Sequence, residues 1–206
     1  MIHSRARHPA AQIVAYGAIF FCVTSLTIFW TRFSGGLALV WPGTAIAAAL
    51  FLTIPRSHSL PAAVSLAALS TLATSLFGFG PDWAFPLALV NVFEAWLIAW
   101  MLVRFRPQRD YIESEVGIVW LGFLAGIIGP LAASIPGGML ASQIVDGSWQ
   151  NHSFSWWIAH GLGTLLVMPL TLLLASYRKP VFARMLEPDR ILPFVGMVLL
   201  TMGISA

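Results

Sequence analysis

Charged residues are scarce in this chain of 206 residues: Asp, Glu, Lys and Arg make up only 9%, against about a quarter of an ordinary soluble domain. Hydrophobic residues make up 58%, and the mean hydropathy is +0.83. A single soluble core cannot bury that much apolar surface, so the solvent must be lipid. The composition excludes a water-soluble globular domain and predicts an all-α integral membrane protein.

Cysteine is also nearly absent. The single Cys22 lies in an apolar run, which excludes a disulfide framework within one chain and a CxxC metal or redox site. The sequence has no HExxH, GxSxG or GxxxxGK[ST] motif and no clustered His/Cys spacing, so hydrolase, zinc-protease and nucleotide-driven activities have no residues to support them. We therefore expect no catalysis, no metal and no cofactor within this chain.

Long apolar runs are present, and six of them are close to the ~20 residues that cross ~30 Å of hydrocarbon. They cover residues 11–30, 37–54, 61–79, 86–103, 116–135 and 156–175. A seventh run begins near Ile191 and is still apolar at Ala206, so we expect the domain to be incomplete at its carboxyl end. Short connections rich in Pro, Gly and Arg favour sequential antiparallel helices. The prediction is a polytopic transmembrane helical bundle with six complete spans and the start of a seventh.

The basic residues predict the orientation of these spans. If residues 1–10 form a cytoplasmic tail, Arg32 alone of the eleven Lys and Arg residues lies outside. The other basic residues fall on the inner side, namely Arg5, Arg7, Arg56, Arg104, Arg106, Arg109, Arg178, Lys179, Arg184 and Arg190. Positive residues favour cytoplasmic loops. We therefore expect a cytoplasmic amino terminus. The net charge of +3 reflects basic residues at one membrane face, and we expect no nucleic-acid partner.

Tryptophans gather at the predicted outer boundary, where amphipathic indole rings favour the headgroup zone. They are Trp30, Trp41, Trp83, Trp149, Trp156 and Trp157. This placement is typical of an anchoring belt, and the alternative is that some of these rings line a pocket open to the outer side. The external connection of residues 136–155 begins with Pro136-Gly137-Gly138. It predicts a surface loop, with a partly re-entrant hairpin as the alternative.

Two ionisable residues lie within the predicted spans, Glu94 in the fourth and His160 in the sixth. A charged residue at the centre of a transmembrane helix costs roughly 2.5–3.5 kcal/mol on insertion scales, so each of these two residues requires a structural or functional explanation. At 1.5 Å per residue they lie about 12 Å and 6 Å below the outer boundary, close enough to pair directly or through water. Asn91 projects from the same helix face as Glu94. The functional interpretation is a ligand-sensing or proton-sensitive site, and the structural one is hydrogen bonding between helices, at about 0.6 kcal/mol per bond.

Small and rigid residues frame these polar positions. Pro42 and Gly43 open the second run, where proline suits a first helical turn and glycine permits close approach of a neighbouring backbone. In the sixth run, Gly161 and Gly163 predict close helix contact, and Pro169 predicts a bend. The candidate ligand-sensing residues are Asn91, Glu94, His160, Trp41 and Trp157.

Three segments in order resemble a known pattern: residues 40–47 (VWPGTAIA), residues 91–95 (NVFEA), and residues 156–163 (WWIAHGLG) continuing to Pro169-Leu170. They are similar to the first of the MASE domains, the membrane-associated sensor family. Its Trp-Pro element matches Trp41 and Pro42, its Asn-x-x-Glu element matches Asn91 and Glu94, and its Leu-Gly and Pro-Leu elements match residues 162–163 and 169–170. Relatives often have an acidic residue shortly before the Leu-Gly pair, whereas this chain has His160. This departure permits a Glu94–His160 pair and prevents a simple transfer of ligand preference.

The resemblance implies a sensory module of the bacterial inner membrane, commonly with about eight spans, attached to diguanylate cyclases, phosphodiesterases or histidine kinases. It implies that residues 11–206 are an integral membrane sensor domain for an unknown small ligand. The expected partners are a second copy of the chain, in a homodimer, and a cytoplasmic output domain. Two other functions remain open from the residues alone. One is a small-solute transporter or substrate-capture membrane subunit, and the other is a scaffold that holds partner membrane proteins.

Overall fold

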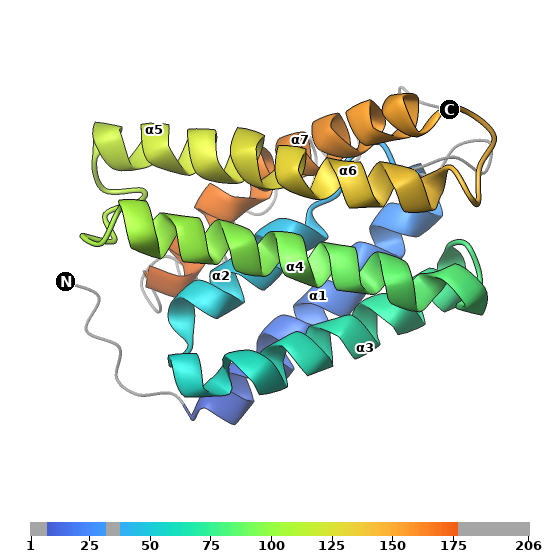
Figure 1. The fold of residues 1–206 in the computed structure, drawn as a ribbon. Coiled ribbons are helices and arrows are strands. Elements are labelled where there is room, and N and C mark those ends of the chain that lie inside the picture. The colour runs from blue at the N-terminus through green and yellow to red at the C-terminus, as the bar shows by residue number, and fades with distance from the viewer. Residues whose placement is uncertain (1–7, 32–37, 177–206) are drawn as a thin grey trace, which may run out of the picture. The chain divides into compact units, whose positions relative to one another are not determined.

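The computed structural model describes residues 8–31 and 38–176, and every regular element in these ranges is helical (Figure 1). This confirms the all-α prediction. The chain divides into two compact units, Met1–Thr171 and Leu172–Ala206, and the first contains the elements that build the site. The predicted seventh run lies outside the described residues.

Within the described residues, five helical segments are long and apolar enough to cross a membrane, which agrees with five of the six predicted runs. They are α1 (Pro9–Thr31), α3 (Ser59–Phe77, after the 3-10 turn Arg56–His58), α4 (Pro81–Phe105), the continuous helix α5–η3–α6, and α7 (Trp149–Ser176). The continuous helix consists of α5 (Glu115–Phe123), the π-helix η3 (Leu124–Ile128) and α6 (Gly129–Ala141). An α-helix satisfies its own backbone hydrogen bonds, as a segment in lipid must.

The second predicted span has a different structure. Its helix α2 (Gly43–Thr53) has 11 residues, which is about 16 Å at 1.5 Å per residue and too short to cross ~30 Å of hydrocarbon. Residues 38–42 before it are not helical, because Pro42 disfavours helical backbone at the preceding residue and has no N–H to donate. The Trp41 N–H instead donates to the Ala159 carbonyl on α7, at 2.9 Å.

Helix α2 is enclosed by its neighbours. Nine of its residues are buried, and Ala45, Ala48, Ala49 and Leu50 have no exposed surface. A helix that is apolar all round is typical of a core position, and the small alanine side chains let α1, α3 and α4 pack against it (Figure 1). Irregular backbone such as residues 38–42 is tolerated at membrane depth only where protein covers it. Burial of α2 therefore allows a broken segment inside the bundle.

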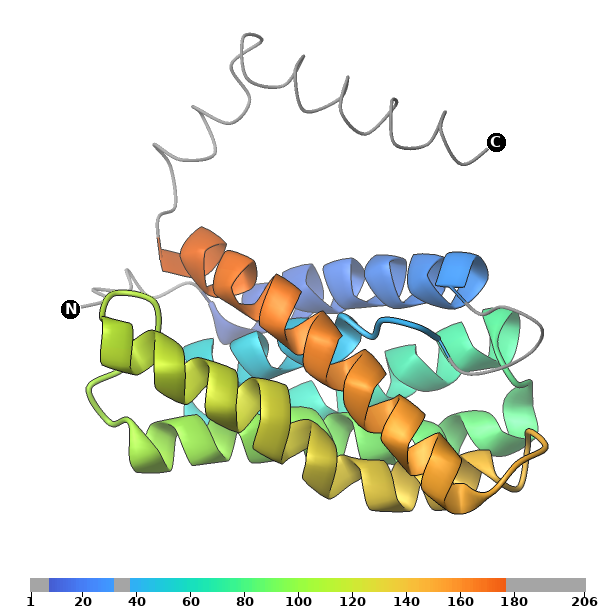
Figure 2. The same ribbon diagram turned by 90° about the horizontal axis from the view of Figure 1, so that it is seen from above.

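Helices α3 and α4 form an antiparallel pair next to α2 and α6 (Figure 1). Their connection is only residues 78–80, and Gly80 has the positive φ of 81° that glycine adopts without strain. Helix α7 runs obliquely across its neighbours (Figure 2). Helix α4 contains the fourth predicted run and α7 contains the sixth. These two runs come together in the bundle.

The fifth helix extends further than predicted. Its π-helix forms where the Gly129 N–H donates to the Leu124 carbonyl five residues earlier, because Pro130 has no N–H to continue the α-helical pattern. Beyond it, Pro136 lies inside α6, which continues to Ala141, and α7 already begins at Trp149. The predicted external connection of residues 136–155 was therefore wrong in its bounds, since only residues 142–148 connect the two helices.

Candidate functional site

Glu94 and His160 meet in the interior of the bundle. The His160 Nδ1 lies 2.7 Å from the Glu94 Oε2, and the Trp156 Nε1–H donates to the same oxygen at 3.3 Å. Glu94 is completely buried and His160 is 4% exposed. Glu94 is the fourteenth of the 25 residues of α4, and His160 the twelfth of the 28 of α7, so both lie further from the start of their helices than predicted. The earlier helix starts at Pro81 and Trp149 explain this difference.

Two indole rings hold the His160 imidazole on both faces. The Trp156 ring stacks at a centroid distance of 4.4 Å, and the Trp41 ring at 5.6 Å. The Thr44 hydroxyl, in the first turn of α2, lies 3.4 Å from the same Nδ1 atom that faces Glu94. Stacked rings fix the imidazole plane, and the opposite nitrogen, Nε2, has no hydrogen-bond partner among the described residues.

Asn91 lies one helical turn before Glu94 and is 5% exposed. Its Nδ2 donates to the Ser70 hydroxyl of α3 at 3.3 Å, while its Oδ1 has no hydrogen-bond partner in the described part of the chain. The Glu94 Oε1 and the Trp41 Nε1 are likewise buried without a partner there. Buried polar groups without partners are costly and uncommon. Three such atoms, on Trp41, Asn91 and Glu94, therefore belong to the residues around His160.

A pocket reaches this polar group from the end of the bundle where α1 and α3 terminate. It has a cavity volume of about 50 Å³, by the measure in which one water needs about 10–15 Å³. Its walls are mostly apolar, with Ile28, Phe79 and Leu87 among them, and its polar members include Asn91 and His160. Glu94 does not line the pocket and lies behind His160. A molecule in the pocket would therefore contact His160 directly and interact with Glu94 only through the imidazole ring.

The two adjacent tryptophans of α7 have different positions. Trp156 and Trp41 line the pocket, whereas the Trp157 Nε1–H donates to the Ile127 carbonyl in the π-helix η3 at 3.2 Å. Trp157 was a predicted pocket wall, and the structure does not bring it to the pocket. Sequence reasoning did not select Trp156, although its place four residues before His160 puts both on one helix face.

The motif glycines and prolines lie at close contacts between elements. A Cβ at Gly163 would overlap the backbone of Trp41 and Pro42, and a Cβ at Gly161 would lie 2.5 Å from the Gly126 carbonyl oxygen. A Cβ at Gly43 would lie 2.9 Å from the Thr24 hydroxyl oxygen. Small residues allow helices to approach closely in membranes. Pro42 directly precedes α2, and Pro169 lies inside α7.

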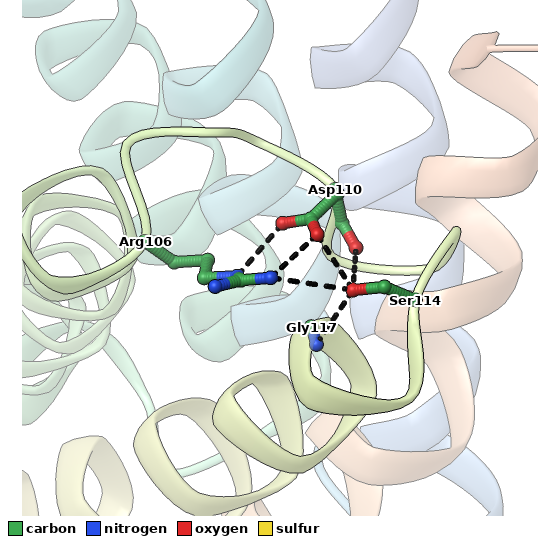
Figure 3. Close-up of polar contacts among 4 residues, drawn as sticks. All are labelled: Arg106, Asp110, Ser114 and Gly117. Carbon is green, nitrogen blue, oxygen red and sulfur yellow. Dashed lines mark hydrogen bonds and ion pairs between the residues drawn. The ribbon is translucent and has the colours of Figure 1, made fainter.

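A second polar cluster joins α4 to α5 (Figure 3). The Arg106 guanidinium donates to both carboxylate oxygens of Asp110, at 2.8 and 2.6 Å, and the Ser114 hydroxyl donates to Asp110 at 2.6 Å. Ser114 also accepts from the Gly117 N–H at 3.0 Å and so caps the amino terminus of α5. The hydrogen bonds from Arg106 and Ser114 lower the pKa of Asp110, and burial raises the pKa of Tyr111. This cluster fixes the start of α5.

The described side chains of the main site offer hydrogen-bonding groups in a mostly apolar surrounding. The described residues contain no group of three or more His, Cys, Asp or Glu side chains that could hold a metal ion. One carboxylate and one imidazole share a close contact, and an amide oxygen lies near them on α4. This arrangement suits recognition of a small molecule.

Comparison with protein-family models identifies the chain: the MASE1 model matches residues 11–204. The chain belongs to the MASE1 family. MASE1 is a membrane sensory domain found in signalling proteins, so the match confirms the resemblance seen in the sequence. The comparisons with curated proteins and with solved structures give no match. In this MASE1 domain, all three resemblance segments contribute to the Glu94–His160 site, through Trp41 and Thr44, Asn91 and Glu94, and Trp156 and His160.

Proposed function

We propose that this MASE1 chain is the sensory input domain of a signalling protein of the bacterial inner membrane, and that it senses a small molecule in the pocket beside His160. The observation that supports the proposal most directly is the pocket itself, which reaches a buried polar group held between α2, α4 and α7. Ionisable residues at membrane depth are expensive and mark functional sites.

Signal transmission in this proposal uses the helices that meet at His160. A molecule in the pocket contacts α4 through Asn91 and α7 through His160 and Trp156, and it changes how these helices pack around α2. A ligand can shift the balance between two packings only by its differential affinity for them. The rearrangement then passes to a cytoplasmic output of the cyclase, phosphodiesterase or histidine-kinase type, which supplies the catalysis. We also place the protein in a homodimer.

The orientation in this proposal follows the basic residues, with the amino terminus in the cytoplasm. The pocket then opens toward the outer side, since it lies where α1 and α3 end. Cysteine accessibility tests this orientation, because a cysteine introduced at Ser57, before α3, should react only with a permeant reagent. Labelling of that residue from outside in intact cells would reverse the assignment.

The functional test measures output activity in the full-length signalling protein, reconstituted in lipid nanodiscs. Glu94→Gln and His160→Gln should change basal output by at least several-fold or abolish its response to stimulus while the protein stays folded. Trp157→Phe is a matched control on α7, because this side chain lies at the π-helix and not at the pocket. Unchanged output in both variants, with only a loss of stability, would favour a scaffold over a sensor.

A transporter is the second candidate, and the interrupted segment of residues 38–53 favours it. Broken helices that end at membrane depth are typical of substrate sites in secondary transporters. Solute flux into proteoliposomes separates the two functions. A sensor binds without net transport, so an uptake that disappears in Glu94→Gln would overturn the sensory proposal.

A further inference from the structure

The pocket beside His160 also restricts the chemistry of its ligand. This inference rests on the proposed sensory function and concerns the same site. We infer that the ligand is an uncharged small molecule whose head group both accepts and donates a hydrogen bond, as a carboxamide or a primary alcohol does.

The donor that meets this head group lies beside the free edge of His160. The Nδ1 atom already faces Glu94 and Thr44, at 2.7 and 3.4 Å. Both faces of the ring are covered by the indoles of Trp41 and Trp156. Only the edge with Nε2 remains for a molecule in the pocket. The Trp41 Nε1–H beside this edge is buried without a partner among the described residues and belongs to a residue that lines the pocket, so it donates to an oxygen of the ligand.

The acceptor is the Oδ1 of Asn91. Its amide nitrogen is occupied by Ser70, so the amide is oriented with the oxygen unpartnered. Asn91 is 5% exposed and lines the same pocket as His160. A ligand N–H or O–H would satisfy this oxygen and remove the cost of leaving it unpaired.

The charge balance excludes an ionic head group. The Glu94 carboxylate lies behind His160 and does not line the pocket, and the pocket lining has no Asp, Glu, Lys or Arg. An added carboxylate or ammonium would therefore be desolvated without a counterion, which is strongly unfavourable in an apolar interior. A neutral head group avoids that cost.

The enclosed part of the ligand must be small. A cavity of about 50 Å³ holds about three to five waters at 10–15 Å³ each, which corresponds to a head group of similar heavy-atom number. The apolar residues Leu87, Phe79 and Ile28 line the remainder of the pocket. They favour an alkyl or aromatic remainder on the ligand over a second polar group.

Three probes of nearly equal size test this inference: propionamide, propionate and propylammonium. The full chain in lipid nanodiscs, with ¹⁵N-labelled histidine, reports binding through the His160 Nε2 resonance, which His160→Gln assigns. Propionamide should shift this resonance saturably, and the two ions should bind at least tenfold more weakly. Asn91→Leu should weaken propionamide binding about tenfold, whereas Trp157→Phe should leave it unchanged.

The outcomes separate the ligand class from the sensory function. Stronger binding of propionate or propylammonium than of propionamide would overturn the uncharged class and leave a sensory pocket in place. Failure of all three probes, or equal binding of propionamide to wild type and Asn91→Leu, would overturn the class as well. The proposed function is tested separately. It is overturned if the output activity of the full-length protein is unchanged in both Glu94→Gln and His160→Gln.

Discussion

The Glu94 Oε2 lies 2.7 Å from the His160 Nδ1, and this contact joins α4 to α7 in the interior of the bundle. Removing either partner leaves the other buried without its strongest contact. Glu94→Gln and His160→Gln should each lower the free energy of unfolding by about 1–3 kcal/mol. The double variant should cost less than the sum of the two, with an interaction energy of about 0.5–3 kcal/mol.

Reversible unfolding in mixed detergent micelles measures these four free energies. Ser142→Ala serves as a control for the preparation, because this exposed side chain bonds only the Met139 carbonyl of its own helix. Strict additivity of the Glu94 and His160 effects would show that the pair contributes no coupling between the two helices.

The close approach of α7 to the segment before α2 depends on Gly163. A Cβ at this position would overlap the carbonyl group of Trp41 and the nitrogen of Pro42, and backbone atoms cannot move aside as a flexible side chain can. Gly163→Ala should therefore cost about 1–3 kcal/mol through overpacking. It should also disturb sensing, because it displaces Trp41 from His160.

Gly122→Ala is the matched control for this prediction. Its Cβ would meet only the Leu165 Cδ2, at an ordinary 3.8 Å. Replacing a helical glycine by alanine without a clash is neutral or stabilising by up to about 1 kcal/mol. Unfolding measurements on the two variants check the contrast, and equal stabilities would mean that α7 adjusts freely around residue 163.

Hydropathy predicted five of the helices well but not the structure of the second run. Residues 37–54 have enough apolar residues for a span, yet hydropathy does not distinguish a lipid-facing helix from a buried broken segment. The local signal was Pro42, which disfavours helical backbone at Trp41. What the sequence could not provide is the partner of the Trp41 N–H, the Ala159 carbonyl, which lies more than a hundred residues away.

The Pro136-Gly137-Gly138 segment illustrates the opposite error. Such residues end helices in water, where the backbone can bond to solvent, so the prediction placed a loop there. In the structure they lie within α6, and a Cβ at Gly138 would overlap the Ser153 side chain of α7. Glycine here permits helix contact, as is common in membrane helices.

The polar residues of the site were predictable because charge is rare in apolar runs. Glu94 and His160 were conspicuous for that reason, and Asn91 followed from its spacing. The choice between Trp156 and Trp157 was not predictable in the same way. Consecutive residues on a helix point in directions about 100° apart, and the sequence does not show which side of α7 faces the other helices. The structure resolves this choice in favour of Trp156, which bonds to Glu94.

Trp156→Phe and Trp157→Phe should therefore differ in function although they change the same side chain. Trp156→Phe removes the indole donor to Glu94 and should cost about 0.6–1.7 kcal/mol, the range of hydrogen bonds between membrane helices. It should also alter ligand response, because its ring lines the pocket. Trp157→Phe removes only the bond to the Ile127 carbonyl and should retain the response. Dose–response curves of output activity check this, and a larger functional loss in Trp157→Phe would reverse the assignment.

The Arg106–Asp110 ion pair predicts a pH dependence at the other end of α4. Its hydrogen bonds hold the pKa of Asp110 below the ordinary value in the folded protein. The stabilisation is therefore present above the unfolded-state pKa of about 3.9 and is lost as the pH falls through the lower folded-state pKa. Asp110→Asn should destabilise the protein at pH 7 and do so less and less as the pH falls toward 3.

The measurement is the difference in thermal unfolding midpoint between wild type and Asp110→Asn, taken at several pH values in detergent. Taking a difference cancels the titration of the other carboxylates. Glu113→Gln is a matched control three residues away, because the Glu113 side chain has no ion pair among the described residues. A difference for Asp110→Asn that stays constant from pH 7 to pH 3 would mean that Arg106 stabilises the start of α5 without using the carboxylate charge, and that the Ser114 cap alone fixes this turn.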